Sequence, residues 1–397
     1  MRSSQFSTFL LLVAVVAPVA AQSAPTEITE LRRRVAAIRA DMDGVTATAD
    51  FAADLFTRDP ASRFLFSATR NPGLRAEFDW HTGASPEMGD ADDPVARGIV
   101  VLPVSSWEAG GFTIPTAIER WQSAGRPVII LASQAGKPEL PIIRHVVSNG
   151  AVDGTRAQAG INEIANLIAA WTMYVEFVAS ATRRHWQPGI YVSHLIPHAD
   201  DSNYKVKFHA ATRGPVAPIA AGTLGNQYLD RIDSLLVHAA RPQHLALVQR
   251  AADSLRAVRA AGHRLFVGSC AHYLQVGVLG DTIRSPFRPV YAHYDIAPPL
   301  GAAGARPGDA LLWFGYDGYD CPHIQASVPL QEAGIKVVVV ADNLPNQIPG
   351  NVMTAIPLGA KVPEHIGTAP FAPEGVGSAT SVEALIHYLW LKRLVSQ

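Results

Sequence analysis

Residues 308–342, GDALLWFGYDGYDCPHIQASVPLQEAGIKVVVVAD, decide the fold class of this chain. The stretch contains two continuous apolar runs, ALLWFG and IKVVVV. Between them, residues 324–334 have the spacing of a helix that ends at Gly334. Because neither run alternates with polar residues, both suit a parallel sheet that helices cover on its two faces. A strand, a helix and a strand in this order predict a right-handed crossover.

The same order of elements occurs twice in the chain. Each copy begins with a long polar helical stretch, continues through strands and a helix, and closes on an apolar helix. The first copy has helical patterns at 27–56, 116–125 and 161–181 and strands at 63–68, 98–106 and 126–133. The second copy has helical patterns at 227–262, 324–334 and 381–395 and strands at 264–269, 309–315 and 335–342. The sequence therefore predicts a duplicated α/β protein.

Composition and the N-terminus complete the predicted organisation. The chain has 397 residues, is 48% hydrophobic and carries a net charge of −1, so it has no basic field for nucleic acid and no polybasic membrane patch. Arg2, an apolar core and the small residues of VAA predict a signal peptide over residues 1–21. No other segment reads as apolar over about 20 residues. We expect a periplasmic or secreted protein with no membrane attachment after cleavage.

In its second copy the chain resembles the SIS (sugar isomerase) domain family. Residues 308–342 are similar to the family's strand, serine-rich loop, helix and strand. LFVGSCAHYLQ, from residue 265, is similar to its first strand and turn, and EGVGSATSVEALIHYLWL, from residue 374, is similar to its glutamate-containing segment and closing helix. The resemblance implies two flavodoxin-like doubly wound parallel-sheet domains in tandem, at 22–184 (degenerate) and 226–397, with a connector at 185–225. It also implies a sugar site at the carboxyl ends of the strands and two copies that face each other as an internal pseudo-dimer. A homodimer of whole chains is compatible with it.

The loop after Trp313 departs from the family pattern. The family loop has two serines and a threonine that hold a sugar phosphate at a helix N-terminus. In this chain the serines align with Gly315 and Asp317, the threonine aligns with Asp320, and Gly318 is retained. A phosphate carries about −1.5 to −2 charges, and each like-charge pair about 4 Å apart costs about 4 kcal/mol at an effective dielectric near 20. The sequence therefore predicts an unphosphorylated carbohydrate ligand.

Two interpretations of these aspartates remain open. Asp320 has the position of a helix N-cap and would then fill the anion site from within. Alternatively, the two acids accept hydrogen bonds from sugar hydroxyls, in which case the site needs no cofactor. As a variant, they bind Ca²⁺ or Mg²⁺, which prefer oxygen ligands. In the first copy, one alignment puts Ser106 and Glu108 at the serine positions, and another puts Glu108 and Gly110 there with Thr113 at the threonine.

Candidate catalytic residues follow from the chemistry of isomerisation, which moves a proton between adjacent carbons by means of a carboxylate or histidine. The resemblance assigns the base to Glu374, with Thr380 also matching the family segment. His272 and His323 follow predicted strands and are candidates for opening the sugar ring. The predicted ligand-binding residues are Ser269, Gly315, Asp317, Gly318, Asp320, Ser106, Glu108 and Thr380.

Three further features leave alternatives open. Related domains carry a glutamate in the first helix, and Glu77 fits that position in the first copy. His194, His198, Asp200 and Asp201 in the connector resemble a metal site, although Pro197 makes helical geometry doubtful. Cys270 and Cys321 each follow a strand end of the second copy and form either a disulfide or two free thiols.

These observations predict an exported SIS-like protein that binds or converts a carbohydrate derivative. If it is an enzyme, aldose–ketose isomerisation or a related lyase reaction fits best, with Glu374 as base. The alternatives are a non-catalytic carbohydrate-binding protein and a divalent-metal hydrolase built on the histidine-rich connector.

Overall fold

The structure is a computed structural model. It describes residues 25–67, 72–78, 84, 88–104, 114–133, 141, 143–152, 159–191, 208–209, 212–269, 285–291, 296–315, 327–342, 344, 348–359, 367–369 and 372–397. The signal-peptide prediction lies outside these residues.

The first half of the chain contains five helices and five strands of its sheet within the described residues: α1 (Thr26–Ala40), α2 (Met42–Arg58), β1 (Arg63–Phe66), α3 (Pro72–Phe78), β2 (Met88–Asp90), β3 (Gly98–Pro103), α4 (Ile114–Ser123), β4 (Val128–Ala132), β5 (His145–Ser148) and α5 (Ala159–Arg183). Short antiparallel pairs follow in the connector: β6 (Trp186–Gln187) with β9 (Thr212–Arg213), and β7 (Ile190–Tyr191) with β8 (Phe208–His209).

The second half repeats this order and adds a hairpin. Its elements are α6 (Thr223–Ala239), α7 (Pro242–Ala260), β10 (Leu265–Ser269), β11 (Phe287–Tyr291), α9 (Ala297–Ala302), β12 (Ala310–Gly315), α10 (Ser327–Glu332), β13 (Lys336–Ala341), β14 (Val352–Pro357), β15 (Gly367–Ala369), β16 (Ala372–Val376) and α11 (Thr380–Ser396).

Both large sheets are parallel and have the same strand order. The first runs β2-β1-β3-β4-β5 and the second β11-β10-β12-β13-β14. Counted within each half, both orders are 2-1-3-4-5, which is the flavodoxin-like doubly wound order. The predicted fold, two such α/β sheets in tandem, is therefore confirmed. The domain boundaries predicted from the sequence stay a prediction.

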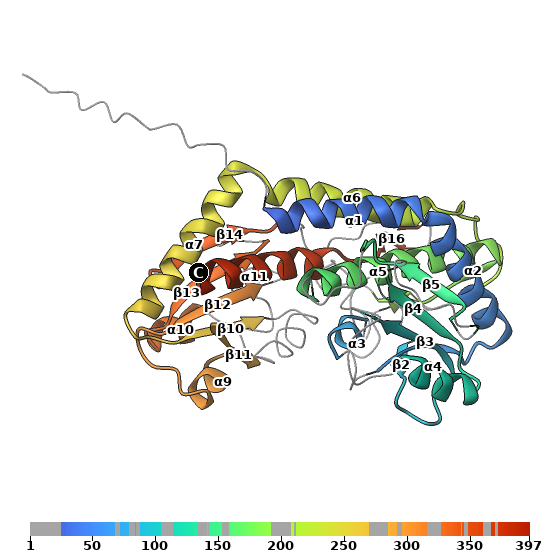
Figure 1. Cartoon of the computed structure of the whole chain (residues 1–397), viewed down its shortest axis with the longest axis horizontal. Coiled ribbons are helices and arrows are strands. Elements are labelled where there is room, and N and C mark those ends of the chain that lie inside the picture. The colour runs from blue at the N-terminus through green and yellow to red at the C-terminus, as the bar shows by residue number, and fades with distance from the viewer. Residues whose placement is uncertain are drawn as a thin grey trace, which may run out of the picture.

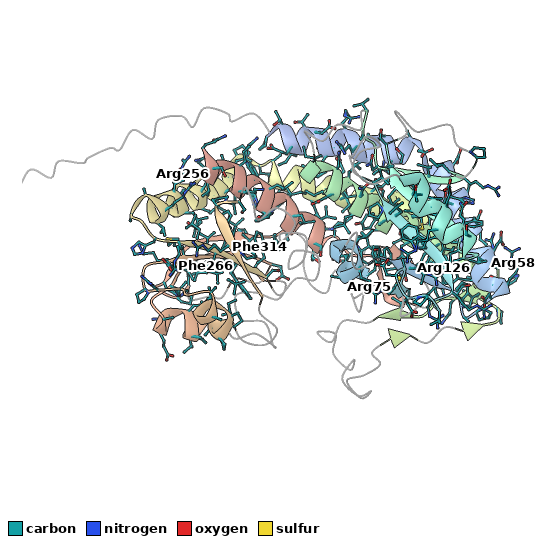
Figure 2. The ribbon with its side chains drawn as sticks, turned by 60° about the horizontal axis from the view of Figure 1, so that its bottom comes forward. Arg58, Arg75, Arg126, Arg256, Phe266 and Phe314 are labelled. Atoms are coloured by element: carbon teal, nitrogen blue, oxygen red, sulfur yellow. The ribbon has the colours of Figure 1, made fainter. Side chains whose placement is uncertain are left out.

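The core has three parts because successive strand residues point to opposite faces of a sheet. The largest cluster lies between the sheets and contains Val101 of the first half and Val267 of the second. Smaller clusters cover the outer face of each sheet. Phe266 belongs to an outer cluster and Phe314 to the central one, so the two rings mark opposite faces of the second sheet (Figure 2).

Helices from both halves share the central core. In Figure 1, α1 and α6 run side by side along one edge of the molecule, and α5 and α11 run between the two sheets. Arg32 of α1 pairs with Asp233 of α6 at 2.7 Å, and Arg39 pairs with Asp230 at 2.8 Å. This packing is consistent with two copies that face each other within one chain.

Helix α5 is more apolar than the sequence analysis recognised. Residues Gly160–Arg183 are long and apolar enough to cross a membrane by length and composition, and they are the one such segment in the part of the chain that the structure describes. The most apolar 18 residues of this helix are all buried inside the protein. A helix surrounded by protein on all sides has this composition.

Candidate functional site

The carboxyl edge of the second sheet contains two of the predicted binding residues. In sheets of this order, ligands bind where the chain leaves adjacent strands in opposite directions, here beside β10 and β12. Ser269 ends β10, Gly315 ends β12, and Ser269 is aligned with Phe314 across the pair. Ser269 is buried. The structure thus brings these two predicted residues to the same edge.

The other predicted residues at this edge lie outside the described residues. They are Asp317, Gly318, Asp320, His272 and His323, together with Cys270 and Cys321. The same holds for Ser106, Glu108, Gly110 and Thr113 of the first half, and for His194, His198, Asp200 and Asp201 of the connector. Their roles stay predictions.

At the carboxyl edge of the first sheet, the polar side chains Ser67, Ser133 and Asn149 form hydrogen bonds to other protein groups. Ser67, after β1, donates to Asp92 Oδ2 at 2.8 Å, and Ser133, after β4, donates to the carbonyl oxygen of Ala151 at 2.7 Å. Asn149, after β5, donates from Nδ2 to Oδ1 of Asn166 at 2.9 Å. This edge is stabilised by its own side chains, as a degenerate copy would be.

The segment that contains Glu374 is held firmly after β16. Gly377 has a φ of +84°, and a Cβ at this position would lie 2.9 Å from Val175 Cγ1 of α5, so only glycine fits without displacement. The carbonyl oxygen of Ser378 accepts from the Tyr228 hydroxyl at 3.1 Å, and the hydroxyls of Ser378 and Thr380 are 2.9 Å apart. Thr380, a predicted binding residue, is buried. Glu374 lies within β16, but its side chain is outside the description.

Glu77 connects this segment to the first half. Its carboxylate is fully buried on α3, accepts from Trp171 Nε1 of α5 at 3.0 Å, and accepts from Ser381 Oγ of α11 at 2.7 Å. The predicted first-helix glutamate therefore contacts protein groups from both halves. Through Ser381 it positions the first turn of α11, directly after the Glu374 segment.

A second acid, Glu163, was not recognised from the sequence. It lies near the start of α5, where α11 passes so closely that a Cβ on Gly160 would lie 2.8 Å from Leu389 Cδ2. The Glu163 side chain is exposed to solvent at the surface of α5; the protein packed around its carboxyl raises the pKa, and Lys392 opposes that rise. The pattern that points to it is a polar pair, Asn162 and Glu163, at the head of an otherwise apolar helix.

Two buried histidines of the second half form a direct hydrogen bond. His387 Nδ1 donates to the carbonyl oxygen of Glu383 at 2.8 Å, so its Nε2 is free of hydrogen and accepts from His244 Nε2 at 2.6 Å. Burial lowers the pKa of His244 to about 3 and that of His387 to about 4. Nearby His238 favours the neutral state of both rings further, and Arg241 favours that of His244. Both rings are uncharged at neutral pH.

Among the described residues, no group of three or more histidine, cysteine, aspartate or glutamate side chains is arranged to hold a metal ion. The connector cluster proposed from the sequence lies elsewhere in the chain, so this finding does not test it.

The sequence matches no protein-family model and no curated protein. Solved structures do align over nearly the full length. A candidate sugar binding protein from Salmonella typhimurium LT2 shares 12% identity at a TM-score of 0.49, over 94% of this chain and 99% of that one. Candidate phosphosugar isomerases from Silicibacter pomeroyi DSS-3 (13%, TM-score 0.47, 93% of this chain and 95% of that one) and Clostridium difficile 630 (9%, TM-score 0.49, 94% and 93%) align similarly.

These identities are too low to transfer an activity. The strand order itself, found twice, establishes the architecture. In fold, the chain is a tandem α/β protein whose two parallel sheets share one strand order.

Proposed function

We propose that the carboxyl edge of the second sheet binds an unphosphorylated carbohydrate derivative and that Glu374 acts on it as a general base. The observation that supports this most is the anchoring of the Glu374 segment. Contacts from α3, α5 and α6 hold residues 376–381, and a catalytic group needs such a rigid frame. The internal hydrogen bonds at the first sheet favour the second sheet as the pocket.

The choice of a neutral sugar rests on electrostatics. Asp317 and Asp320 replace hydroxyls in the loop after β12. A helix N-terminus attracts an anion by about 1 kcal/mol, which two nearby carboxylates outweigh. An exported protein, as the N-terminal pattern predicts, also meets few sugar phosphates. A divalent cation between the acids would reverse this preference.

Catalysis would be aldose–ketose isomerisation. Glu374 removes the proton from C2 of the open-chain sugar and returns it to C1, with His272 or His323 assisting ring opening. Incubation with neutral aldoses in D₂O would detect deuterium at C1 of the ketose product and at C2 of aldose that is re-formed. We expect Glu374→Gln to lower exchange by about 100-fold or more while sugar binding persists. Glu119→Gln, which removes an exposed acid from α4, is the matched control and should have no effect.

The ligand class has its own test. Thermal shift with neutral sugars, sugar phosphates and divalent cations should show stabilisation by neutral sugars alone. Asp317→Ser combined with Asp320→Thr restores the family hydroxyls and should admit a sugar phosphate. Tight metal-free binding of a sugar phosphate by the unaltered chain would contradict the proposal. Binding without any deuterium exchange would instead favour a non-catalytic carbohydrate-binding protein.

A further inference from the structure

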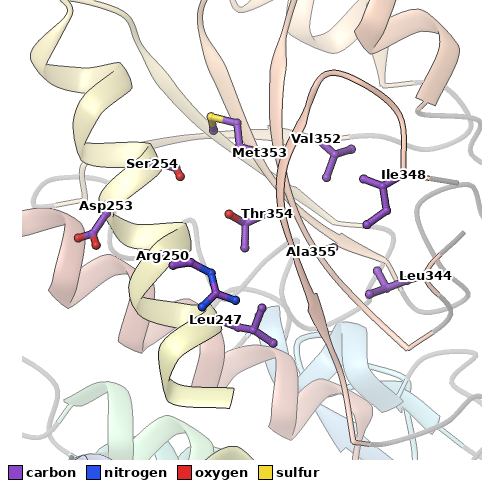
Figure 3. Close-up of a pocket in the computed structure, with 10 residues that line it drawn as sticks. All are labelled: Leu247, Arg250, Asp253, Ser254, Leu344, Ile348, Val352, Met353, Thr354 and Ala355. Atoms are coloured by element: carbon purple, nitrogen blue, oxygen red, sulfur yellow. The ribbon is translucent and has the colours of Figure 1, made fainter. Parts of the chain in front are cut away.

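A cavity of about 530 Å³ lies between α7 and the outer strand β14 (Figure 3). Strand β13 separates β14 from β12, so the cavity is apart from the carboxyl edge where the sugar is proposed to bind. Its volume is in the range of small-molecule sites. The residues that line it are Leu247, Arg250, Asp253, Ser254, Leu344, Ile348, Val352, Met353, Thr354 and Ala355.

One wall of this groove is apolar. Leu344, Ile348 and Val352 form it near β14, with Met353 and Ala355 completing the strand side. Ile348 is 54% exposed, which is a large exposure for an aliphatic side chain. Covering such a wall with hydrocarbon removes apolar surface from water, which favours binding.

The α7 wall supplies a positive charge. The carboxylate of Asp253 accepts from Gln249 at 2.9 Å and from Arg256 at 2.5 Å, and these bonds lower its pKa. Arg250 makes no ion pair within the part of the chain that the structure describes. Figure 3 shows its guanidinium extending from α7 toward β14, while Asp253 points away from it. The groove therefore combines hydrocarbon with one available cation.

An aromatic pair occupies the corresponding place in the first half. There, Phe51 of α2 stacks on His145 of β5, with ring centroids 3.9 Å apart and planes 15° from parallel. In each half these are the second helix and the last strand of the sheet, so the same pair of elements is bridged by stacked rings in one copy and lines a cavity in the other.

We propose that the groove between α7 and β14 binds a small amphipathic anion, with a carboxylate on Arg250 and a hydrocarbon body on the apolar wall. Guanidinium binds carboxylate through two parallel hydrogen bonds, which the fork of Arg250 provides. The hydroxyls of Ser254 and Thr354 lie on the same lining and offer further donors. This proposal is independent of the sugar site.

Calorimetric titration of the full chain with decanoate, below its micelle-forming concentration, tests this site. Decanol supplies the body without the charge and acetate the charge without the body. We expect saturable binding of decanoate, with decanol and acetate both weaker. Arg250→Gln should weaken decanoate by about tenfold or more, whereas Arg241→Gln, the same change at an exposed position before α7, should not. Ala355→Phe should fill the groove and remove binding of both decanoate and decanol.

Three results would overturn the proposal. The first is no saturable binding of decanoate. The second is equal affinity for decanoate and decanol with no effect of Arg250→Gln. The third is concentration-dependent dimerisation that Ala355→Phe abolishes, because the groove would then be a contact between two copies of this chain.

Discussion

In each half the second helix contacts the closing helix, and the polar contact between them differs between the halves. In the first half, α2 and α5 are joined by charge: Asp50 accepts from Arg183 at 2.7 Å, from Arg184 at 3.0 Å and from Ser180. In the second half, α7 and α11 are joined by the neutral hydrogen bond between His244 and His387. The corresponding pair of helices therefore carries an ionic link in one half and an uncharged histidine link in the other, and the two links respond differently to pH.

Lowering the pH should give the largest difference in stability between the two helix links. The folded-state pKa values of His244 and His387 are about 3 and 4, below the ordinary value of 6.5, so their contribution to stability is complete above pH 6.5 and is lost as pH falls toward 4. Each histidine loses about 1.4 kcal/mol per pH unit in that window. Hydrogen exchange between pH 7 and 4 should show α7 and α11 losing protection while α2 and α5 keep it.

A substitution isolates the cause. His244→Gln keeps a donor for His387 Nε2 but removes one titrating ring, so the variant should lose less stability between pH 6.5 and 4 than the parent protein. His263→Gln, at a half-exposed histidine beside Asp309, is the control. Identical acid profiles for the parent and His244→Gln would show that the histidine link does not set the response.

Removal of the ionic link should have a smaller effect, and in a different pH range. Asp50→Ala leaves two arginines without their shared acceptor and should cost about 1.5 kcal/mol of unfolding free energy, at the low end for charged hydrogen bonds because Asp50 is partly exposed. Hydrogen bonds lower the pKa of Asp50 despite its burial, so its contribution persists above pH 3.8 and is lost below it. Denaturant unfolding at pH 7 and 5 should give the same loss.

The matched control for this change is Asp54→Ala. Asp54 also pairs with Arg184, at 2.6 Å, but it is 56% exposed. We expect a loss of about 0.5 kcal/mol or less. Equal losses from both substitutions would mean that the α2–α5 link is spread over the whole acidic pair.

The remaining prediction concerns the aromatic pair that takes the place of the groove in the first half. Phe51→Ala removes the ring that stacks on His145 and should cost about 1 kcal/mol, measured by thermal or denaturant unfolding. Val95→Ala, at an 80% exposed position, should change nothing. If Phe51→Ala leaves the stability of the protein unchanged, the surrounding helices, and not the aromatic pair, stabilise this part of the first half.

Much of the fold could be predicted from the sequence. Strands at the centre of each sheet, such as β4 and β13, are continuous apolar runs because both faces are buried, and their pattern is local. The outer strands β2, β5, β11 and β14 were missed. They are half-exposed or short, as the burial of β14 shows, so their composition resembles that of loops.

For the candidate sites, too, local sequence features could be predicted and contacts between distant helices could not. The sequence by itself determined that two α/β copies follow one another and that two acids, Asp317 and Asp320, follow β12, because periodicity and residue identity are properties of neighbouring positions. Only the tertiary structure decided that Glu77 contacts Ser381, that His244 meets His387, and that α7 leaves a groove beside β14. The two histidines are 143 residues apart, and such contacts depend on how whole helices pack, which no local pattern encodes.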